Sequence, residues 1–132
     1  MNRKQAREFV MQTIFQIEIK MDFDKPDIEK YMTECSAGNQ KDYIRNLLSE
    51  ICSNLGKIDG IINAASDGWP SSRMSKPDLA VIRVAVGEIL FADDVPAAVA
   101  INEAVNLAKD YGTEQSPKFV NGVLAKVSKQ LL

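Results

Sequence analysis

Histidine is absent from this sequence of 132 residues, and cysteine occurs only twice. The absence of histidine removes the commonest metal ligand and the side chain whose charge ordinarily changes near neutral pH. Cys35 and Cys52 do not form a CxxC pair, and each falls within a helical apolar pattern. We expect both to be small buried apolar residues in a reducing compartment. We therefore expect no metal site, no cofactor and no catalytic triad that contains histidine.

Long apolar runs and an excess of positive charge are also missing. No stretch reaches the roughly 18 to 20 continuous apolar residues that a membrane span needs. The N-terminus carries charges within its apolar pattern, unlike a signal peptide, so we expect a cytoplasmic protein that does not contact a membrane. The 16 Lys and Arg against 18 Asp and Glu give a net charge of −2. This balance argues against nonspecific nucleic-acid binding, so any contact with a polyanion must be local.

What the sequence does contain is helical periodicity along almost its whole length. No segment alternates apolar and polar residues over the length of a strand, so the pattern predicts an all-α fold of about seven helices. A chain of 132 residues suits one domain. A stretch rich in Gly, Pro and Ser near residues 67–75 marks a boundary between two packed helical bundles, approximately 1–70 and 71–132.

Capping residues and prolines predict where the helices begin and end. Asn39, Ser75 and Ser116 are suitable caps, and a proline suits a first helical turn. The segment from Leu79 to Ala92 contains only two charged residues, and a helix that is apolar nearly all round is buried on several sides. We place it at the centre of the second bundle. The expected helices, the fourth of which could also continue the third, cover residues 6–21, 28–35, 40–56, 58–69, 76–94, 96–112 and 117–131.

The residue types needed for catalysis do not form a convincing constellation. Phosphate-binding glycine loops follow strands, and no strand is expected. The neighbouring carboxylates Asp93 and Asp94 precede Pro96 at a helix start, where acidic side chains favour the positive end of the helix dipole. We therefore expect a protein that is not an enzyme.

A basic cluster opens the chain in the segment "NRKQAR". On a helix, Arg3, Lys4 and Arg7 share an arc of roughly 100° that adjoins the apolar stripe. Such cations could bind a polyanion or could form an ordinary solvated face. Three phosphate contacts with single-stranded RNA would give a salt slope of about −2, which indicates weak binding by this cluster alone.

The segment "SPKFVNGVLAKV" opens the last expected helix with a cation and an aromatic ring. Phe119 falls at the edge of the apolar stripe, Asn121 falls at the other edge, and Lys118 points away. Phe119 is either a core residue or a ring on which an unpaired base stacks, and Asn121 is either a base-edge ligand or a local backbone partner. We expect Gly122 to permit close contact between helices, since glycine costs about 1 kcal/mol within a helix.

The segments "VAINEAVNLAKDYG" and "SPKFVNGVLAKV" together resemble the NusB family of bacterial transcription antitermination factors. The segments "AREFVMQTIFQ" and "GWPSSRMSKPDLAVIRVAVGEIL" extend the resemblance over essentially the whole chain. The resemblance implies seven helices in two bundles and no catalytic activity. It implies binding of boxA RNA, notably in ribosomal RNA leaders, together with NusE, which is also a small-subunit ribosomal protein. It also implies a complex with NusA, NusG and RNA polymerase, and a homodimer in parts of the family.

The resemblance also assigns residues to these roles. The RNA-contacting positions of the family correspond here to Arg3, Lys4, Arg7, Ser116, Lys118, Phe119 and Asn121. The NusE-facing surface corresponds to Arg73, Asp78, Arg83 and Glu88. This chain departs from the family where Asn2 and Gln5 interrupt the N-terminal basic run and where Gly87 replaces a common tyrosine, which we expect to alter the partner surface.

Two alternatives belong to other functional classes. NusB-like domains also occur fused to RNA cytosine methyltransferases, but we do not expect that activity, because a chain of 132 residues leaves no room for a cofactor-binding α/β domain. A helical module that binds only protein, without RNA specificity, remains open. RNA-binding assays with boxA and with scrambled RNA distinguish that module from an antitermination factor.

Overall fold

The computed structural model describes residues 1–33 and 35–131, and within these ranges it is helical with no strand. Seven α-helices confirm the predicted all-α fold. Two short 3-10 turns, η1 and η2, accompany them. The elements are α1 (Arg3–Lys20), α2 (Ile28–Tyr31), η1 (Gly38–Gln40), α3 (Lys41–Ser53), α4 (Leu55–Ala65), η2 (Ser71–Arg73), α5 (Lys76–Phe91), α6 (Ala97–Tyr111) and α7 (Ser116–Leu131).

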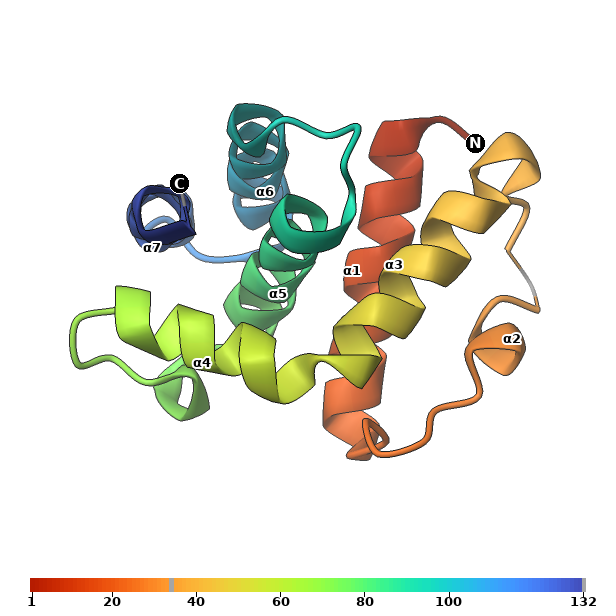
Figure 1. Cartoon of the computed structure of the whole chain (residues 1–132), viewed down its shortest axis with the longest axis horizontal. Helices are drawn as coiled ribbons and strands as arrows, with labels where there is room; N and C mark the ends of the chain where they lie inside the picture. Colours follow the sequence, from red (N-terminus) through yellow and green to blue (C-terminus); the bar gives the residue numbers. More distant parts are fainter. Residues whose placement is uncertain (34, 132) are drawn as a thin grey trace.

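Helix α5 forms the centre of the molecule. Every residue from Leu79 to Glu88 is buried, as the apolar composition of this segment predicts. The helix packs against α1 and α3 on one side and against α4, α6 and α7 on the other (Figure 1). It therefore belongs to both helical groups, and the core residues of the two groups form one continuous cluster.

Helix α4 packs with the second group of helices. The sequence boundary near residue 70 assigns it to the first bundle, but its buried residues Ile58, Ile62 and Ala65 lie in the region where α4 packs against α5 and α7. The chain turns at Asn54, directly after α3, and α4 leads away from α1 (Figure 1). The spatial division between the two groups therefore falls between α3 and α4.

The structure confirms several predicted helix ends and corrects others. Ser75 caps α5, since its Oγ accepts a hydrogen bond from the Asp78 N–H at 3.3 Å. Asn39 is not a cap, because it lies inside η1 and α3 begins at Lys41. Trp69 lies beyond the end of α4 and is 48% exposed, so it does not continue the apolar face of that helix.

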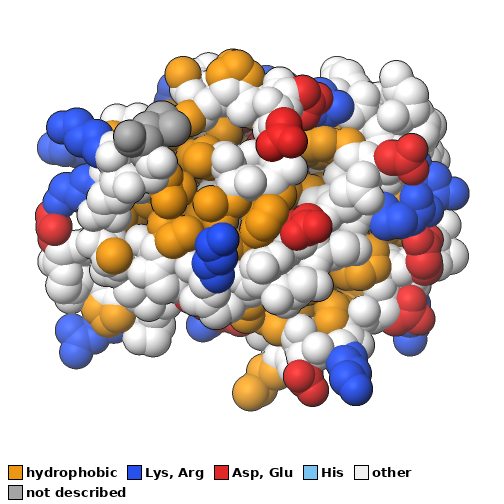
Figure 2. All heavy atoms as spheres, viewed as in Figure 1, with side chains coloured by type: hydrophobic (Ala, Val, Ile, Leu, Met, Phe, Trp, Pro, Cys, Tyr) orange, Lys and Arg blue, Asp and Glu red, His pale blue; other side chains and the backbone are white. Residues whose placement is uncertain are grey.

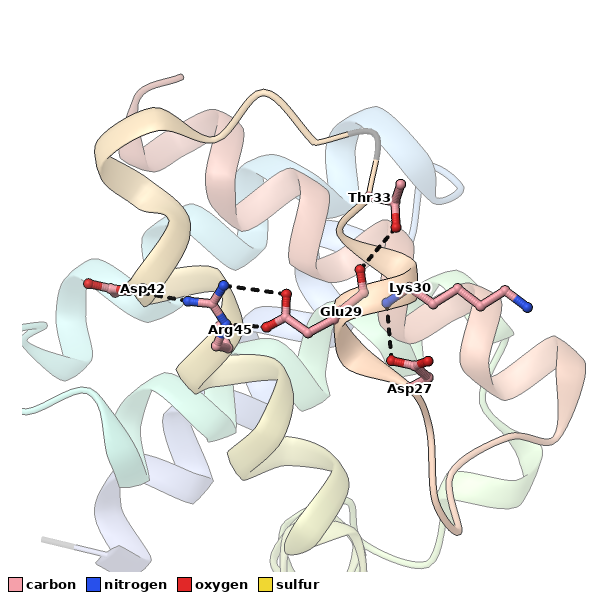
Figure 3. A network of polar contacts seen from close by, with 6 residues as sticks. All are labelled: Asp27, Glu29, Lys30, Thr33, Asp42 and Arg45. Atoms are coloured by element: carbon pink, nitrogen blue, oxygen red, sulfur yellow. Dashed lines mark hydrogen bonds and ion pairs between the residues drawn. The ribbon is translucent and has the colours of Figure 1, made fainter.

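The short helix α2 is attached to α3 through Arg45 (Figure 3). The Arg45 guanidinium pairs with Glu29 of α2 and, at 3.3 Å, with Asp42 one turn earlier on α3. The arginine lowers the pKa of the Glu29 carboxyl through a hydrogen bond. Since both carboxylates are exposed, the pairs orient α2 and contribute little to stability.

The two cysteines are half-buried against the core and are not joined in a disulfide. The expectation of apolar surroundings holds best for Cys52, because burial raises the pKa of its thiol to about 11. The thiol of Cys52 is therefore neutral at physiological pH.

Candidate nucleic-acid interface

The residues that interrupt the N-terminal basic run form the cap of α1. The Gln5 N–H donates to Asn2 Oδ1 at 2.8 Å, and the Asn2 N–H donates to Gln5 Oε1 at 2.9 Å. This reciprocal pair is a capping box, which satisfies two backbone donors at the helix start. Asn2 and Gln5 therefore fix the position at which the basic side chains of α1 begin.

The three basic residues of α1 have different environments. Lys4 is exposed and has no ion pair with a described carboxylate. Arg3 is half-buried, donates from Nε to Gln40 Oε1 at 2.7 Å and lies over the Tyr43 ring at 4.0 Å from its centroid. Its guanidinium is also 3.7 Å from Asp94. Lys4 is thus the cation of this cluster that is free to meet a phosphate, while Arg3 is held by its neighbours.

Arg7 is a buried residue rather than a surface cation. Only 7% of Arg7 and 1% of Glu88 are exposed, and Arg7 Nε donates to both Glu88 oxygens, at 2.8 and 3.0 Å. Burial opposes the charge of Arg7, but the hydrogen bond and attraction from Glu88 raise its pKa overall. Burial also raises the pKa of the nearby Tyr43 phenol, and the Glu88 carboxylate raises it further.

This pair corrects two expectations. Arg7 does not present its charge to RNA, and Glu88 does not present its charge to a partner protein, because each is the other's counter-ion inside the α1–α5 contact. Sequence spacing placed Arg7 next to the apolar stripe of α1. It could not show that a carboxylate on α5 would lie opposite.

The start of α7 also differs from the expectation. Ser116 is the first residue of α7, is 2% exposed, and accepts a hydrogen bond at Oγ from the Thr113 N–H at 2.9 Å. In a capping box, the side chain three residues after the cap accepts a hydrogen bond from the N–H of the cap. Ser116 has this position relative to Thr113. Ser116 is therefore enclosed and cannot touch RNA directly, contrary to the predicted contact. The absent side chain of Gly112 leaves room for it.

The side of α7 that faces outward directly after Ser116 is open to solvent. Lys118 and Asn121 are exposed, and Phe119 is half-buried with one side packed against the core. These positions agree with the sequence expectation of an edge aromatic flanked by polar side chains. The burial of Phe119 on one side fixes its ring, while the other side remains accessible.

A shallow groove of about 430 Å³ lies beside Phe119, between α7 and the C-terminal end of α4. Gly122 lines it, and a Cβ at Gly122 would meet no atom within 4 Å. The sequence expectation that Gly122 allows close helix packing is therefore wrong. The groove is lined by Ala65, Ser66, Asp67, Gln115, Lys118, Phe119, Gly122, Val123 and Lys126.

Tyr111, at the end of α6, connects α1 to the region where α7 begins. Gln12 Nε2 of α1 donates to the Tyr111 hydroxyl at 2.8 Å. Gln12 lies two helical turns after Lys4 on the same side of α1, because residues four apart share a face. A surface thus runs along α1 from Lys4 past Glu8 and Gln12 to Tyr111, five residues before the start of α7.

The four residues expected at a partner surface separate into two groups. Arg73 is exposed and Asp78 is half-buried, with an Oδ1 that has no hydrogen-bond partner among the described residues. Arg83 is only 4% exposed and donates to both oxygens of Asp59, each at 2.9 Å. Arg83 and Glu88 are thus internal ion-pair residues, since α5 is covered on all sides at these positions. Arg73 and Asp78 remain available.

A second cavity, of about 320 Å³, lies beside Pro77 at the start of α5. It is mainly apolar and is formed by α1, the first turn of α5 and the end of α6. The sequence pattern did not predict it, although Phe15 lies off the main apolar stripe of α1 and could have indicated an exposed aromatic. Its lining residues are Met11, Gln12, Phe15, Gln16, Pro77 and Tyr111.

The face formed by α3, α4 and the end of α5 has a different character. Apolar side chains gather in its middle and charged side chains surround them (Figure 2). A cavity of about 430 Å³ on this side contains four carboxylates at its edge and one arginine, Arg3. This acidic composition disfavours a polyanion. The carboxylates are Asp42, Glu50, Asp93 and Asp94.

No group of three His, Cys, Asp or Glu in residues 1–33 and 35–131 is arranged to hold a metal ion. None of the described helices has the length and apolar character to cross a membrane.

The fold and these surfaces define an all-α protein with shallow grooves between its helices. The family model described as "NusB family" matches residues 4–129. The chain belongs to the NusB family, as its sequence motifs predict. A relative from Alkaliphilus oremlandii, named transcription antitermination protein NusB, is 43% identical over 131 residues, covering 98% of this chain and 95% of the relative.

Solved structures agree with this assignment. NusB of T. maritima is 36% identical, with a TM-score of 0.88 over 98% of this chain and 92% of that chain. A crystal structure of the antitermination factors NusB and NusE in complex with double-stranded RNA shares the fold, with a TM-score of 0.83 over 97% of this chain and 96% of that chain, at 23% identity.

Proposed function

We propose that this protein is a transcription antitermination factor that binds boxA-type single-stranded RNA of nascent transcripts, notably in ribosomal RNA leaders. It does so together with a NusE-type small-subunit ribosomal protein, within a complex that includes NusA, NusG and RNA polymerase. The observation that carries the proposal is the start of α7, where Lys118, Phe119 and Asn121 reach solvent together.

The chemistry of this turn suits an unpaired RNA strand. Proteins bind such strands by stacking bases on aromatic rings and by contacting base edges and phosphates. Phe119 supplies a ring held on one side by the core, Asn121 supplies an amide, and Lys118 supplies a charge. Lys4 supplies a second charge at the other end of the surface that passes Tyr111.

The partner site in this proposal is the apolar cavity beside Pro77, at the turn of α5 that also contains Asp78. A cavity of this size receives one or two apolar side chains of the partner. Gln12 and Tyr111 belong both to this cavity and to the surface that leads from Lys4. A bound partner would therefore adjoin the RNA and lengthen the contact surface.

The test compares RNA binding by Phe119→Ala with binding by Phe91→Ala, in gel shifts with boxA and scrambled RNA in the presence of the NusE-type partner. Phe91 is a matched control, since it is a half-buried phenylalanine on the acidic side of the molecule. Loss of one stacked base weakens binding by about 1–3 kcal/mol, so Phe119→Ala should bind boxA at least about fivefold more weakly. Phe91→Ala should bind like the original protein.

Two outcomes would contradict the proposal. Equal binding of boxA and scrambled RNA, or no binding of either with the partner present, would favour a helical module that interacts only with proteins. Unchanged boxA binding by a folded Phe119→Ala variant would show that α7 is not part of the RNA-binding surface.

A further inference from the structure

We propose that the groove between α7 and the end of α4 holds one unstacked nucleobase of the bound RNA, and that Gly122 keeps this groove open. Phe119 forms its stacking face. The inference rests on the proposed function and adds a base-sized subsite to it, with a residue that controls access.

Gly122 is not explained by local structure. It lies inside α7 without a positive φ, and its surroundings are empty where a Cβ would be. Neither the backbone conformation nor helix packing therefore requires glycine, which is a poor helix former compared with alanine. Any side chain at position 122 would occupy the space outside the helix, so a need to keep this space open is a physical reason for glycine there.

Open space alone does not distinguish Gly122, because Gly56 and Gly60 of α4 also have no neighbour within 4 Å. Their positions differ from that of Gly122. Gly56 and Gly60 line none of the described cavities, whereas Gly122 forms part of the groove beside Phe119. Gly122 therefore faces a shallow groove lined by other side chains, in which a ligand can lie.

The arrangement of charges around the groove fits a nucleotide. Lys118, Gly122 and Lys126 follow one another at intervals of four residues and lie along one face of α7. The two lysines are separated by eight residues, which is about 12 Å along the helix axis. Ala65, Phe119 and Val123 supply apolar surface between them. A base can lie over this apolar surface while the phosphates on either side meet the two ammonium groups.

Asp67 holds Lys126 at the edge of the groove through an ion pair. Both side chains are exposed, so a phosphate can compete for the lysine at little cost. The two ammonium groups would make no favourable contact with an apolar side chain of a partner protein, whereas they can pair with phosphates. We therefore assign the groove to RNA.

The decisive variant is Gly122→Leu, which fills the groove without changing charge. Gly60→Leu is the matched control, since it introduces the same side chain at another exposed helical glycine. Leucine is the better helix former, so both variants should stay folded with an unchanged or higher Tm. With the NusE-type partner present, Gly122→Leu should bind boxA RNA about tenfold more weakly, whereas Gly60→Leu should remain within twofold of the original protein.

Two further measurements identify the lost interaction. The salt dependence of binding should stay the same for Gly122→Leu, since no phosphate contact is removed. The second measurement uses a series of boxA RNAs that each carry one abasic nucleotide. At one position, loss of the base should weaken RNA binding by the original protein about tenfold. The same loss should not weaken binding by Gly122→Leu any further, as expected for two changes to one interaction.

The outcomes separate this inference from the proposed function. If the original protein shows no preference for boxA, the proposed function fails. If the original protein binds boxA and folded Gly122→Leu binds it equally well, or if every abasic RNA affects both proteins alike, the nucleobase groove is wrong and the proposed function stands.

Discussion

Arg7 and Glu88 form a buried ion pair between α1 and α5, close to the Tyr43 hydroxyl. A buried pair contributes less than its attraction suggests, because both charges have lost their hydration. Removing one member is costly, since the other is left buried without a counter-ion. The pair therefore fixes how the two helices align, and its effect on RNA binding is indirect.

The single substitution Arg7→Met should lower the free energy of unfolding by about 3–5 kcal/mol, because it leaves the Glu88 carboxylate unpaired. The double variant Arg7→Met, Glu88→Leu should recover most of this loss, and urea unfolding measures both. The folded double variant should also bind boxA RNA as tightly as the original protein. A large loss of RNA affinity in a stable double variant would show that Arg7 contacts the RNA.

At the scale of elements, the contact between α3 and α5 depends on Gly87. A Cβ at Gly87 would lie 2.7 Å from Ile51 Cγ1 and 3.3 Å from Leu47 Cδ1. Ile51 and Leu47 fill the space that a side chain at position 87 would occupy. Gly87 is thus internal, and the expectation that its difference from the family tyrosine alters the partner surface is wrong. The difference alters the packing of α3 on α5.

The variant Gly87→Tyr should lower the free energy of unfolding by about 3 kcal/mol or more, because overpacking forces neighbouring side chains and helices apart. Adding Ile51→Ala should restore part of the loss, since it vacates the nearest occupied space. Thermal unfolding of the two variants, with Ile51→Ala alone as the control, measures the coupling. Purely additive losses would show that Ile51 and residue 87 do not compete for space.

At the scale of the whole molecule, one cavity gathers negative charge. The net charge is −2, and the cavity between α3 and the end of α5 has four carboxylates at its edge. The exposed cations Lys4, Lys118 and Lys126 do not line that cavity. The proposed RNA contacts therefore avoid this acidic cavity, which favours a defined orientation beside a partner.

Binding of boxA RNA should show a modest salt dependence. Three phosphate contacts, from Lys4, Lys118 and Lys126, predict a slope of log K against log salt of about −2. Replacing Lys4 or Lys118 by Ala should each reduce the slope by about 0.7, whereas Lys57→Ala on α4 should leave it unchanged. A slope near zero, or equal effects of all three variants, would show that these lysines are not the phosphate contacts.

The sequence predicted most of the fold because the physical signals are local. Helical spacing of apolar residues, Ser75 as a cap and the glycine at position 112 each act within a few residues of the chain. The half-exposed position of Phe119 followed from the same spacing. The motifs of the last two helices were sufficient to predict the family.

The sequence by itself therefore determined the helices, their buried faces and the exposed turn at Lys118, since each depends on neighbours along the chain. Only the tertiary structure decided that Arg7 and Glu88 neutralise each other, that Arg83 meets Asp59, and that Gly122 borders a groove. These features depend on side chains from helices distant in sequence. Burial and counter-ions decide whether a charged residue binds a ligand or holds the fold, and both arise when the helices pack.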